Sequence, residues 1–271
     1  LDMQFVFTAN PEDYTNRGSI VTPLKDRIGS QILTHYPENI EIAKTITQQE
    51  AKNDLRTAEA VYVPELAKDL LEQISFCARD SEYVDEKSGV SARMSITAFE
   101  NLLSTAERRS LMNGDDKTTI RFSDFTGVIP SITGKIELVY EGEQEGAAFV
   151  ANELIGAATK TLFPLYFPEI KKLVKENEDT PYDKLIEWFF NNEGLELLDE
   201  LNDSDYQVLI DQIEPLEDLV QKYQPQTSKE DRNFMKEFIL WSLVEFDKLS
   251  KKRFTEGYQF NDLYSEFVRG I

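Results

Sequence analysis

The side chains of this sequence that best suit chemistry on phosphates are Asn10, Arg27 and Arg93. Each lies in a short block, FTANP for the asparagine and LKDRI and SGVSARMS for the two arginines. Phosphoryl transfer is catalysed mainly by positioning and by charge aimed at developing negative oxygens. An amide that orients water and two guanidinium groups that neutralise charge would meet that need.

The order of the three blocks resembles the AAA+ ATPases of the magnesium-chelatase/MoxR branch. In that family a strand ends in a polar sensor 1 residue, the next helix ends in an arginine-finger block, and a helical lid carries the sensor 2 arginine. The resemblance implies that Asn10 is sensor 1, Arg27 is the arginine finger and Arg93 is sensor 2. Ile28 replaces the usual Phe of the finger block and keeps that position apolar. The resemblance covers residues 1–136 and gives no information about residues 137–271.

The resemblance also implies how the intact protein works. ATP with Mg²⁺ would be hydrolysed in a ring, expected to be a hexamer. Asn10 would hydrogen-bond the attacking water or the terminal phosphate, Arg27 would act on a neighbouring subunit, and Arg93 would couple phosphate occupancy to lid rotation. The ring would remodel a partner, often one with an integrin-like metal-binding domain. Chaperone or metal-insertion activity, as in MoxR-like relatives, is expected rather than chelation of magnesium into a porphyrin.

Two parts of such an ATPase are missing from the sequence, which has no Gly-x-x-x-x-Gly-Lys-Ser/Thr loop and no acidic strand end of the Walker B type. Without these two motifs, the sequence has no binding site for the phosphates of ATP and for Mg²⁺. In the family both precede the sensor 1 strand, so we expect this chain to be a piece of a longer ATPase. The piece alone is expected to bind no cofactor or metal and to hydrolyse no ATP.

Composition excludes several other classes of protein. The 29 Lys and Arg face 50 Asp and Glu, and the net charge of −21 argues against partners such as nucleic acids and anionic membranes. No run approaches the roughly 18 apolar residues that cross a bilayer, and no targeting signal is evident. The single cysteine, Cys77, excludes an internal disulfide and a multi-cysteine zinc site, and it fits a reducing compartment. The cytoplasm is the expected location.

Plainer interpretations of the three candidates stay open. The Asn-Pro pair at Asn10 is also a common turn after any strand. Arg27 could pair with an acidic neighbour, and Arg93 could form a local salt bridge with Asp85 or Glu86.

Other polar residues favour structural roles. A Ser-His-Asp triad would need His35, the only histidine, which we expect to pack in a buried strand. Cys77 is expected to be an inert buried thiol. Arg17 could contact another subunit but suits a solvated loop, and the acidic residues 176–179 and 196–205 indicate a solvated surface without a calcium loop.

The elements that must position these residues follow from apolar spacing and turn signals. Strands are expected over residues 3–8 and 30–36, and a weak strand over 135–141. Helices are expected over residues 38–52, 63–79, 94–111, 147–162, 182–190, 206–223 and 233–249. Ser123 could cap a further helix that begins at residue 124.

These elements predict a mainly α protein. Residues 1–37 would be the end of an AAA+ α/β core, residues 38–136 the helical lid, and residues 137–271 a separate all-helical domain of unknown role. The aromatic runs 163–167 and 188–190 are expected in the core of that domain, although a partner-docking patch stays open.

Two rival functions remain. One is a non-catalytic helical interaction module whose arginines only resemble those of an ATPase. The other is a self-contained hydrolase with an unrecognised acidic site, which the missing histidine partners and glycine-rich elbows argue against.

Overall fold

The structure is a computed structural model that describes residues 3–8, 23, 26–52, 55–86, 88–171 and 179–263, without the side chains of residues 55, 56 and 58. The chain divides into two units, Leu1–Pro37 and Glu38–Ile271, and each unit is described by itself.

In the first unit, the described residues form extended chain and turn. Residues 3–8 and 30–36, both predicted as strands, join no β-sheet among the described residues. Their apolar side chains lie largely in solvent, with Phe5 68% exposed and Ile32 89% exposed. An apolar strand is stabilised by neighbouring strands, and the described residues provide none. The two strand predictions are therefore wrong for the residues that the structure describes.

The second unit is mainly helical, as the apolar periodicity predicts. Its first half contains α2 (Ile40–Glu50), α3 (Leu55–Ala60), α4 (Glu65–Arg79), α5 (Arg93–Asn113), the 3-10 helix η2 (Phe122–Val128), α6 (Ile129–Thr133), α7 (Tyr140–Glu145) and α8 (Ala147–Tyr166). Two short strands, β1 (Val61–Tyr62) and β2 (Thr118–Thr119), pair in parallel. The weak strand predicted over 135–141 is reduced to a single bridge between Val84 and Leu138.

Local sequence explains where these helices begin and end. The Asn39 side chain caps α2 by accepting a hydrogen bond from the backbone N–H of Ile42. Pro64 immediately precedes α4, where its missing N–H costs nothing. Helix α5 ends at Gly114, whose φ of 74° closes the last turn in the left-handed region that favours glycine. Ser123 lies inside η2 instead of capping a longer helix.

The second half contains α9 (Asp183–Asn191), β3 (Leu195–Leu198), α10 (Asp203–Asp211), α11 (Glu214–Tyr223), α12 (Lys229–Glu245), β4 (Leu249–Phe254) and β5 (Gly257–Asp262). The three strands form one antiparallel sheet in the order β3-β5-β4. The prediction that this region is all-helical is therefore wrong, although helices occupy most of the residues that are predicted to be helical.

Two of the predicted helices are interrupted. The helix predicted over 206–223 is broken into α10 and α11, and Pro215 stands in the first turn of α11. The helix predicted to reach Leu249 ends at Glu245 instead, and Asp247 turns the chain with a φ of 55°. The next residues then form the β4–β5 hairpin.

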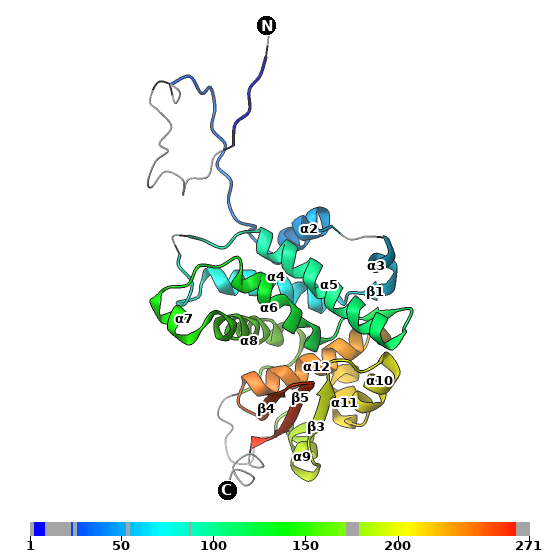
Figure 1. Ribbon diagram of the computed structural model, residues 1–271. Helices are drawn as coiled ribbons and strands as arrows, with labels where there is room; N and C mark the ends of the chain where they lie inside the picture. The colour runs from blue at the N-terminus through cyan, green and yellow to red at the C-terminus, as the bar shows by residue number, and fades with distance from the viewer. Residues whose placement is uncertain are drawn as a thin grey trace. The chain divides into compact units, whose positions relative to one another are not determined.

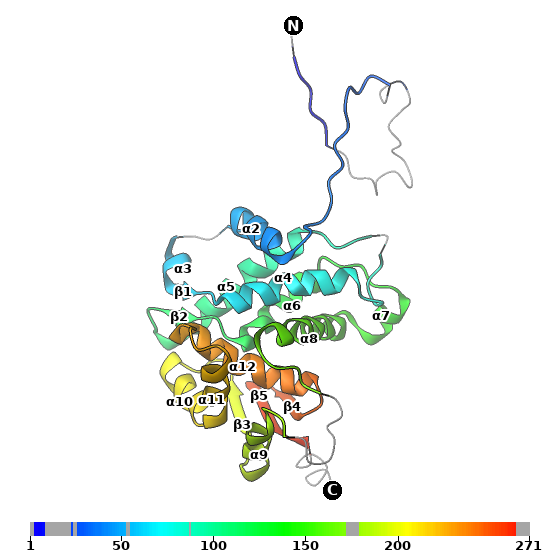
Figure 2. The ribbon, with the colours of Figure 1, turned by 180° about the vertical axis from the view of Figure 1, so that it is seen from behind.

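One apolar core runs through the whole second unit. Helix α8 packs against both α4 and α12 (Figures 1 and 2). The Phe122 ring of η2 stacks on Trp241 of α12 at 4.5 Å between centroids, and Phe163 of α8 lies 5.7 Å from Phe238. The boundary predicted between residues 136 and 137 thus lies inside a continuously packed unit, whereas the one at residue 37 coincides with the division of the chain.

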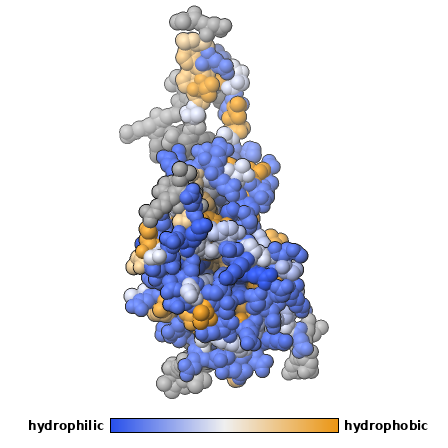
Figure 3. All heavy atoms as spheres, turned by 90° about the vertical axis from the view of Figure 1, so that its right-hand side faces the viewer, coloured by the Kyte–Doolittle hydropathy of each residue, from blue (hydrophilic) through white to orange (hydrophobic). Residues whose placement is uncertain are grey.

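The predicted aromatic runs contribute to this core in part. Phe163 and Phe189 are fully buried, whereas Leu165 is 72% exposed and Phe190 is 66% exposed. The face drawn in Figure 3 is largely hydrophilic over the helical unit, with small apolar patches. None of the helices in the described part of the chain combines the length and apolar content that a membrane span requires.

Candidate functional site

The three predicted site residues are distributed over the two units. Asn10 lies outside the described residues, as does Arg17. Arg27 follows Asp26 in a turn of the first unit, and its exposed side chain makes no hydrogen bond or ion pair with any described residue. Arg93 belongs to the second unit. The structure therefore describes no single site that contains all three.

Arg93 is the first residue of the 21-residue helix α5. Its backbone N–H donates to the hydroxyl of Ser91, 3.2 Å away. The guanidinium group is exposed and pairs with none of the described residues, so the salt bridge with Asp85 or Glu86 that the sequence left open is not formed among them. The group is free to meet an external anion.

The loop before α5 is held in place by its own contacts. The hydroxyl of Ser88 lies 2.8 Å from Oδ2 of Asp85 and also contacts Glu137, and the backbone N–H of Asp85 donates to the carbonyl of Glu137 at 2.8 Å. Gly89 takes a φ of 69° in this loop. These contacts fix the path of the chain just ahead of Arg93.

His35 and Cys77 differ in how well their predictions hold. His35 is exposed, with Nδ1 2.8 Å from the carbonyl oxygen of Tyr36, so the prediction that it packs in a buried strand is wrong. Cys77 is half-buried on α4 rather than buried, and burial raises the pKa of its thiol. That it is inert stays a prediction.

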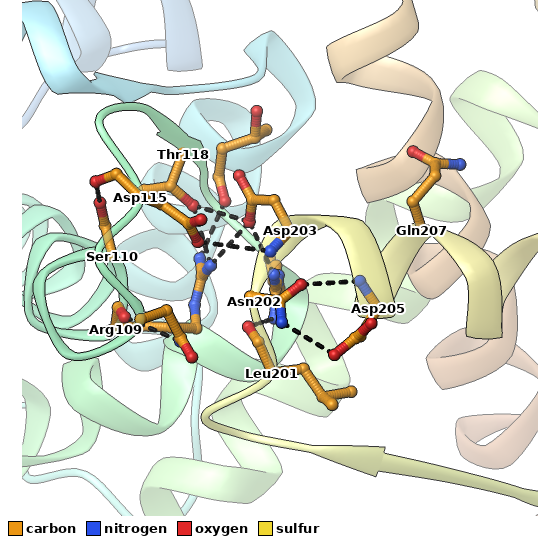
Figure 4. Close-up of polar contacts among 12 residues, drawn as sticks. Arg109, Ser110, Asp115, Thr118, Leu201, Asn202, Asp203, Asp205 and Gln207 are labelled. Atoms are coloured by element: carbon orange, nitrogen blue, oxygen red, sulfur yellow. Dashed lines mark hydrogen bonds and ion pairs between the residues drawn. The ribbon is translucent and has the colours of Figure 1, made fainter.

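A polar cluster in the described part of the second unit centres on Arg109 (Figure 4), which is not one of the predicted site residues. Arg109 is 1% exposed on α5, and its Nη2 lies 2.9 Å from Oδ2 of Asp124 in η2. Its Nη1 donates to the Thr118 hydroxyl at 2.8 Å and contacts Asp203 of α10 at 3.1 Å. Residues far apart in the chain thus meet at one guanidinium group.

Asp203 joins this cluster to a second buried arginine. Nη2 of Arg121 lies 2.7 Å from Oδ1 of Asp203, and Nη1 donates to the carbonyl of Leu201 at 2.8 Å. The guanidinium also lies 4.0 Å from the ring centroid of Tyr206. The acidic residues of 196–205 lie at the surface as predicted, but Asp203, whose side chain is 38% exposed, also pairs with the two buried arginines.

Glu237 of α12 completes the polar interior. It is fully buried, and one carboxylate oxygen accepts hydrogen bonds from the backbone N–H groups of Phe122 and Ser123 at the start of η2. The other oxygen and the hydroxyl of Tyr206 form no hydrogen bond of standard geometry among the described residues, although the two groups interact with each other. Burial raises the pKa of Glu237 to about 7, against the opposing charge of Arg121.

Beside this cluster, α10 and α12 line two open surface pockets of about 480 and 400 Å³ that share Gln207, Lys229 and Asn233. Lys236 in the larger pocket is held by Asp211 at 2.7 Å and by Glu217 at 2.8 Å. The positive charge of Lys236 in that pocket is therefore already neutralised by two carboxylates of the protein.

These buried pairs position helices rather than react. Arginine does not titrate in proteins, and in the described part of the chain no three His, Cys, Asp or Glu side chains gather as a metal site. The sequence did hold a signal for Arg109, because it continues the apolar stripe of the predicted helix 94–111 through Leu102 and Ala106. A charged residue in such a stripe must find a buried partner.

Comparison of the chain with family models, with curated proteins and with solved structures finds no match.

Proposed function

We propose that this chain is part of an AAA+ ATPase of the magnesium-chelatase/MoxR type. The intact protein would hydrolyse ATP in a ring, expected to be a hexamer in the cytoplasm, and remodel a partner protein. That partner would be a protein with an integrin-like metal-binding domain or a target of metal insertion.

Arg93 carries the proposal. Its guanidinium is exposed, unpaired among the described residues, and attached to the first residue of a long helix whose N-terminus favours negative charge. A structural arginine on an acidic protein would be expected to bind one of the many carboxylates. A sensor 2 arginine has to stay available for a phosphate.

Arg27 supports the same function from the first unit. Its side chain is exposed and makes no ion pair with a described residue. A finger that acts on a neighbouring subunit needs such freedom, because its partner is a phosphate oxygen of another chain.

ATP would supply the phosphoanhydride bond that is cleaved. In this proposal Asn10 orients the attacking water, while Arg27 and Arg93 neutralise charge on the phosphate oxygens. The phosphate-binding loop and the Mg²⁺ ligands would come from a segment outside this sequence, because the sequence contains neither.

The test uses the longest gene product that contains this sequence. We expect its coding sequence to include a Gly-Lys-Ser/Thr loop upstream of Leu1, and we expect Arg27→Ala to lower ATP turnover by about 10³ to 10⁵ while ATP binding is retained. Arg27→Lys, which keeps the charge but loses the planar fork, should be nearly as impaired. A gene product without such a loop, or an Arg27→Ala variant with normal turnover, would refute the proposal.

A non-catalytic helical interaction module, in which the arginines only resemble those of an ATPase, is the second candidate. The same assay separates the two functions, because a module of that kind has no turnover for Arg27→Ala to abolish.

A further inference from the structure

The strand β4 forms one edge of the sheet β3-β5-β4 (Figure 1). Its sequence LSKKRF holds three cations, in a chain whose net charge is −21. Of its six residues only Leu249 is buried, so the strand is not covered along its length by the described part of the chain. An edge strand of this kind presents backbone groups that no neighbouring strand uses.

The hydrogen-bond pattern of the sheet identifies these backbone groups. The N–H of Asp199 donates to the carbonyl of Glu256 at 2.8 Å and continues the pairing of β3 with β5. Even-numbered residues of β5 therefore bond β3, and odd-numbered residues bond β4. Lys252 pairs with an odd-numbered residue, so its backbone groups point into the sheet. Those of Lys251 and Arg253 point outward and form no backbone hydrogen bond with a described residue.

The three cations of β4 differ in whether this chain already holds them. Lys251 lies 3.7 Å from the ring centroid of Trp241, and Arg253 pairs with Asp199 at 2.6 Å. Lys252 points to the opposite face of the strand, because successive side chains alternate. It is exposed, and none of the described carboxylates lies within 4 Å of its ammonium group. Lys252 is therefore the cation of β4 that remains available to a partner.

We propose that the outer edge of β4 binds an acidic extended segment of a partner protein, which becomes a fourth strand of the sheet. The backbone of that segment bonds the outward N–H and C=O groups of Lys251 and Arg253 and supplies affinity. A carboxylate directly opposite Lys252 supplies specificity. This inference is independent of the proposed ATPase function.

Charge decides which class of strand fits this edge. Lysine on an edge strand is a common protection against pairing with other strands. Two β4 strands from two copies of this chain, paired antiparallel, would bring the cations of residues 251–253 in each copy together, and like charges opposite one another destabilise a sheet. An acidic segment forms a cross-strand ion pair with Lys252 instead.

The test uses a fluorescein-labelled peptide of four Thr-Glu repeats, whose binding to the chain is measured by fluorescence anisotropy. Salt at about 0.15 M screens the rest of the acidic surface. With a glutamate opposite Lys252, the threonines lie opposite Lys251 and Arg253, and their N–H and C=O groups face β4. N-methylation of the threonines should therefore abolish binding. N-methylation of the glutamates, whose N–H groups point away from β4, should leave binding in place.

Two variants and a second peptide make the assignment specific. Lys252→Glu puts like charges opposite each other and should weaken binding about tenfold. Lys135→Glu makes the same change of charge at an exposed lysine outside the sheet and should bind as the native chain does. A peptide of four Pro-Glu repeats has the same charge but lacks half of the N–H donors, and it should not bind.

Several results would overturn the proposal. These are no saturable binding below about 1 mM peptide, equal binding of the two N-methylated peptides, and unchanged binding to Lys252→Glu. Self-association of the chain that Lys252→Glu alone disrupts would assign the edge to a second copy instead of an acidic partner.

Discussion

Arg109 binds both carboxylate oxygens of Asp124, with Nη2 2.9 Å from Oδ2 and Nε 3.3 Å from Oδ1. The two side chains are only 2% and 3% exposed. Removing one member of a buried pair leaves the other charge without compensation, which costs more than the pair contributes. This relationship joins α5 to η2 and, through Asp203, to α10.

Asp124→Asn is expected to lower the free energy of unfolding by about 3 to 5 kcal/mol, because Arg109 would stay buried with part of its charge unpaired. Urea denaturation measures the change. The control is Arg108→Ala on the same helix, whose ion pair with Glu200 is 59% and 40% exposed and should contribute at most about 1 kcal/mol. Equal effects of the two variants would contradict a buried, energetically coupled pair.

Glu237 should make stability depend on pH. Its folded pKa of about 7 lies above the ordinary value of 4.5, so the protonated carboxyl favours the folded state. That contribution is complete below about pH 4.5 and is lost as the pH rises through about 7. Since each pKa unit corresponds to about 1.4 kcal/mol, the loss amounts to about 3 kcal/mol.

Glu237→Gln removes this titration and keeps an oxygen that can accept from the backbone of η2. Measured by urea denaturation, the stability of Glu237→Gln relative to the native chain should improve by about 3 kcal/mol between pH 5 and pH 8. The exposed Glu230→Gln serves as control and should show no such change. A relative stability of Glu237→Gln that is constant with pH would show that Glu237 does not titrate in this range.

Gly257 lies where the β4–β5 hairpin meets β3. A Cβ at this position would lie 2.2 Å from the carbonyl oxygen of Leu197 and 2.8 Å from the Cα of Leu198. Gly257→Ala is therefore expected to lower the unfolding free energy by about 1 to 3 kcal/mol through forced separation of the strands. Gly29→Ala, whose Cβ meets nothing within 4 Å, should have little effect. Similar thermal midpoints for the two variants would argue against the close strand contact.

Phe122 tests whether the second unit unfolds as a whole. Its ring is 1% exposed and stacks on Trp241, which lies in the other half of the unit. Phe122→Ala should cost about 3 to 5 kcal/mol. Circular dichroism and tryptophan fluorescence should then report the same shifted transition. Two separate transitions, with only one of them shifted, would instead support two domains that meet near residue 136.

Helices with a regular apolar stripe could be predicted from the sequence. Leu66, Leu70 and Ile74 recur at helical spacing, and all three are buried on α4. The long helix that begins at Arg93 likewise matches its predicted range, and this places the arginine at a helix start. Its role as a sensor stays a prediction, as do those of Asn10 and Arg27.

The β4–β5 hairpin was missed because its outer strand reads LSKKRF, which is neither strongly apolar nor strictly alternating. What stabilises that strand is long-range: Lys251 lies over Trp241, and Arg253 pairs with Asp199 at 2.6 Å. Periodicity in one segment holds no information about such partners.

The buried polar cluster could be anticipated only in part. The place of Arg109 in an apolar stripe indicates that it is buried, but its partner Asp203 lies 94 residues further along the chain. Asp203 sits in an acidic run that composition alone marks as solvent-exposed. Long-range packing, which no local pattern specifies, decides which aspartate of that run pairs with Arg109 and Arg121.

The most direct test of the central claim compares two arginines of α5 in the longest gene product that contains this sequence. Arg93→Ala should reduce Mg²⁺-dependent ATP turnover by about a hundredfold, because one charge that stabilises the reacting phosphate is lost. Arg108→Ala, at the other end of the helix and already paired with Glu200, should leave turnover unchanged. If Arg93→Ala hydrolyses ATP as fast as Arg108→Ala does, Arg93 is not a nucleotide sensor and the ATPase proposal fails.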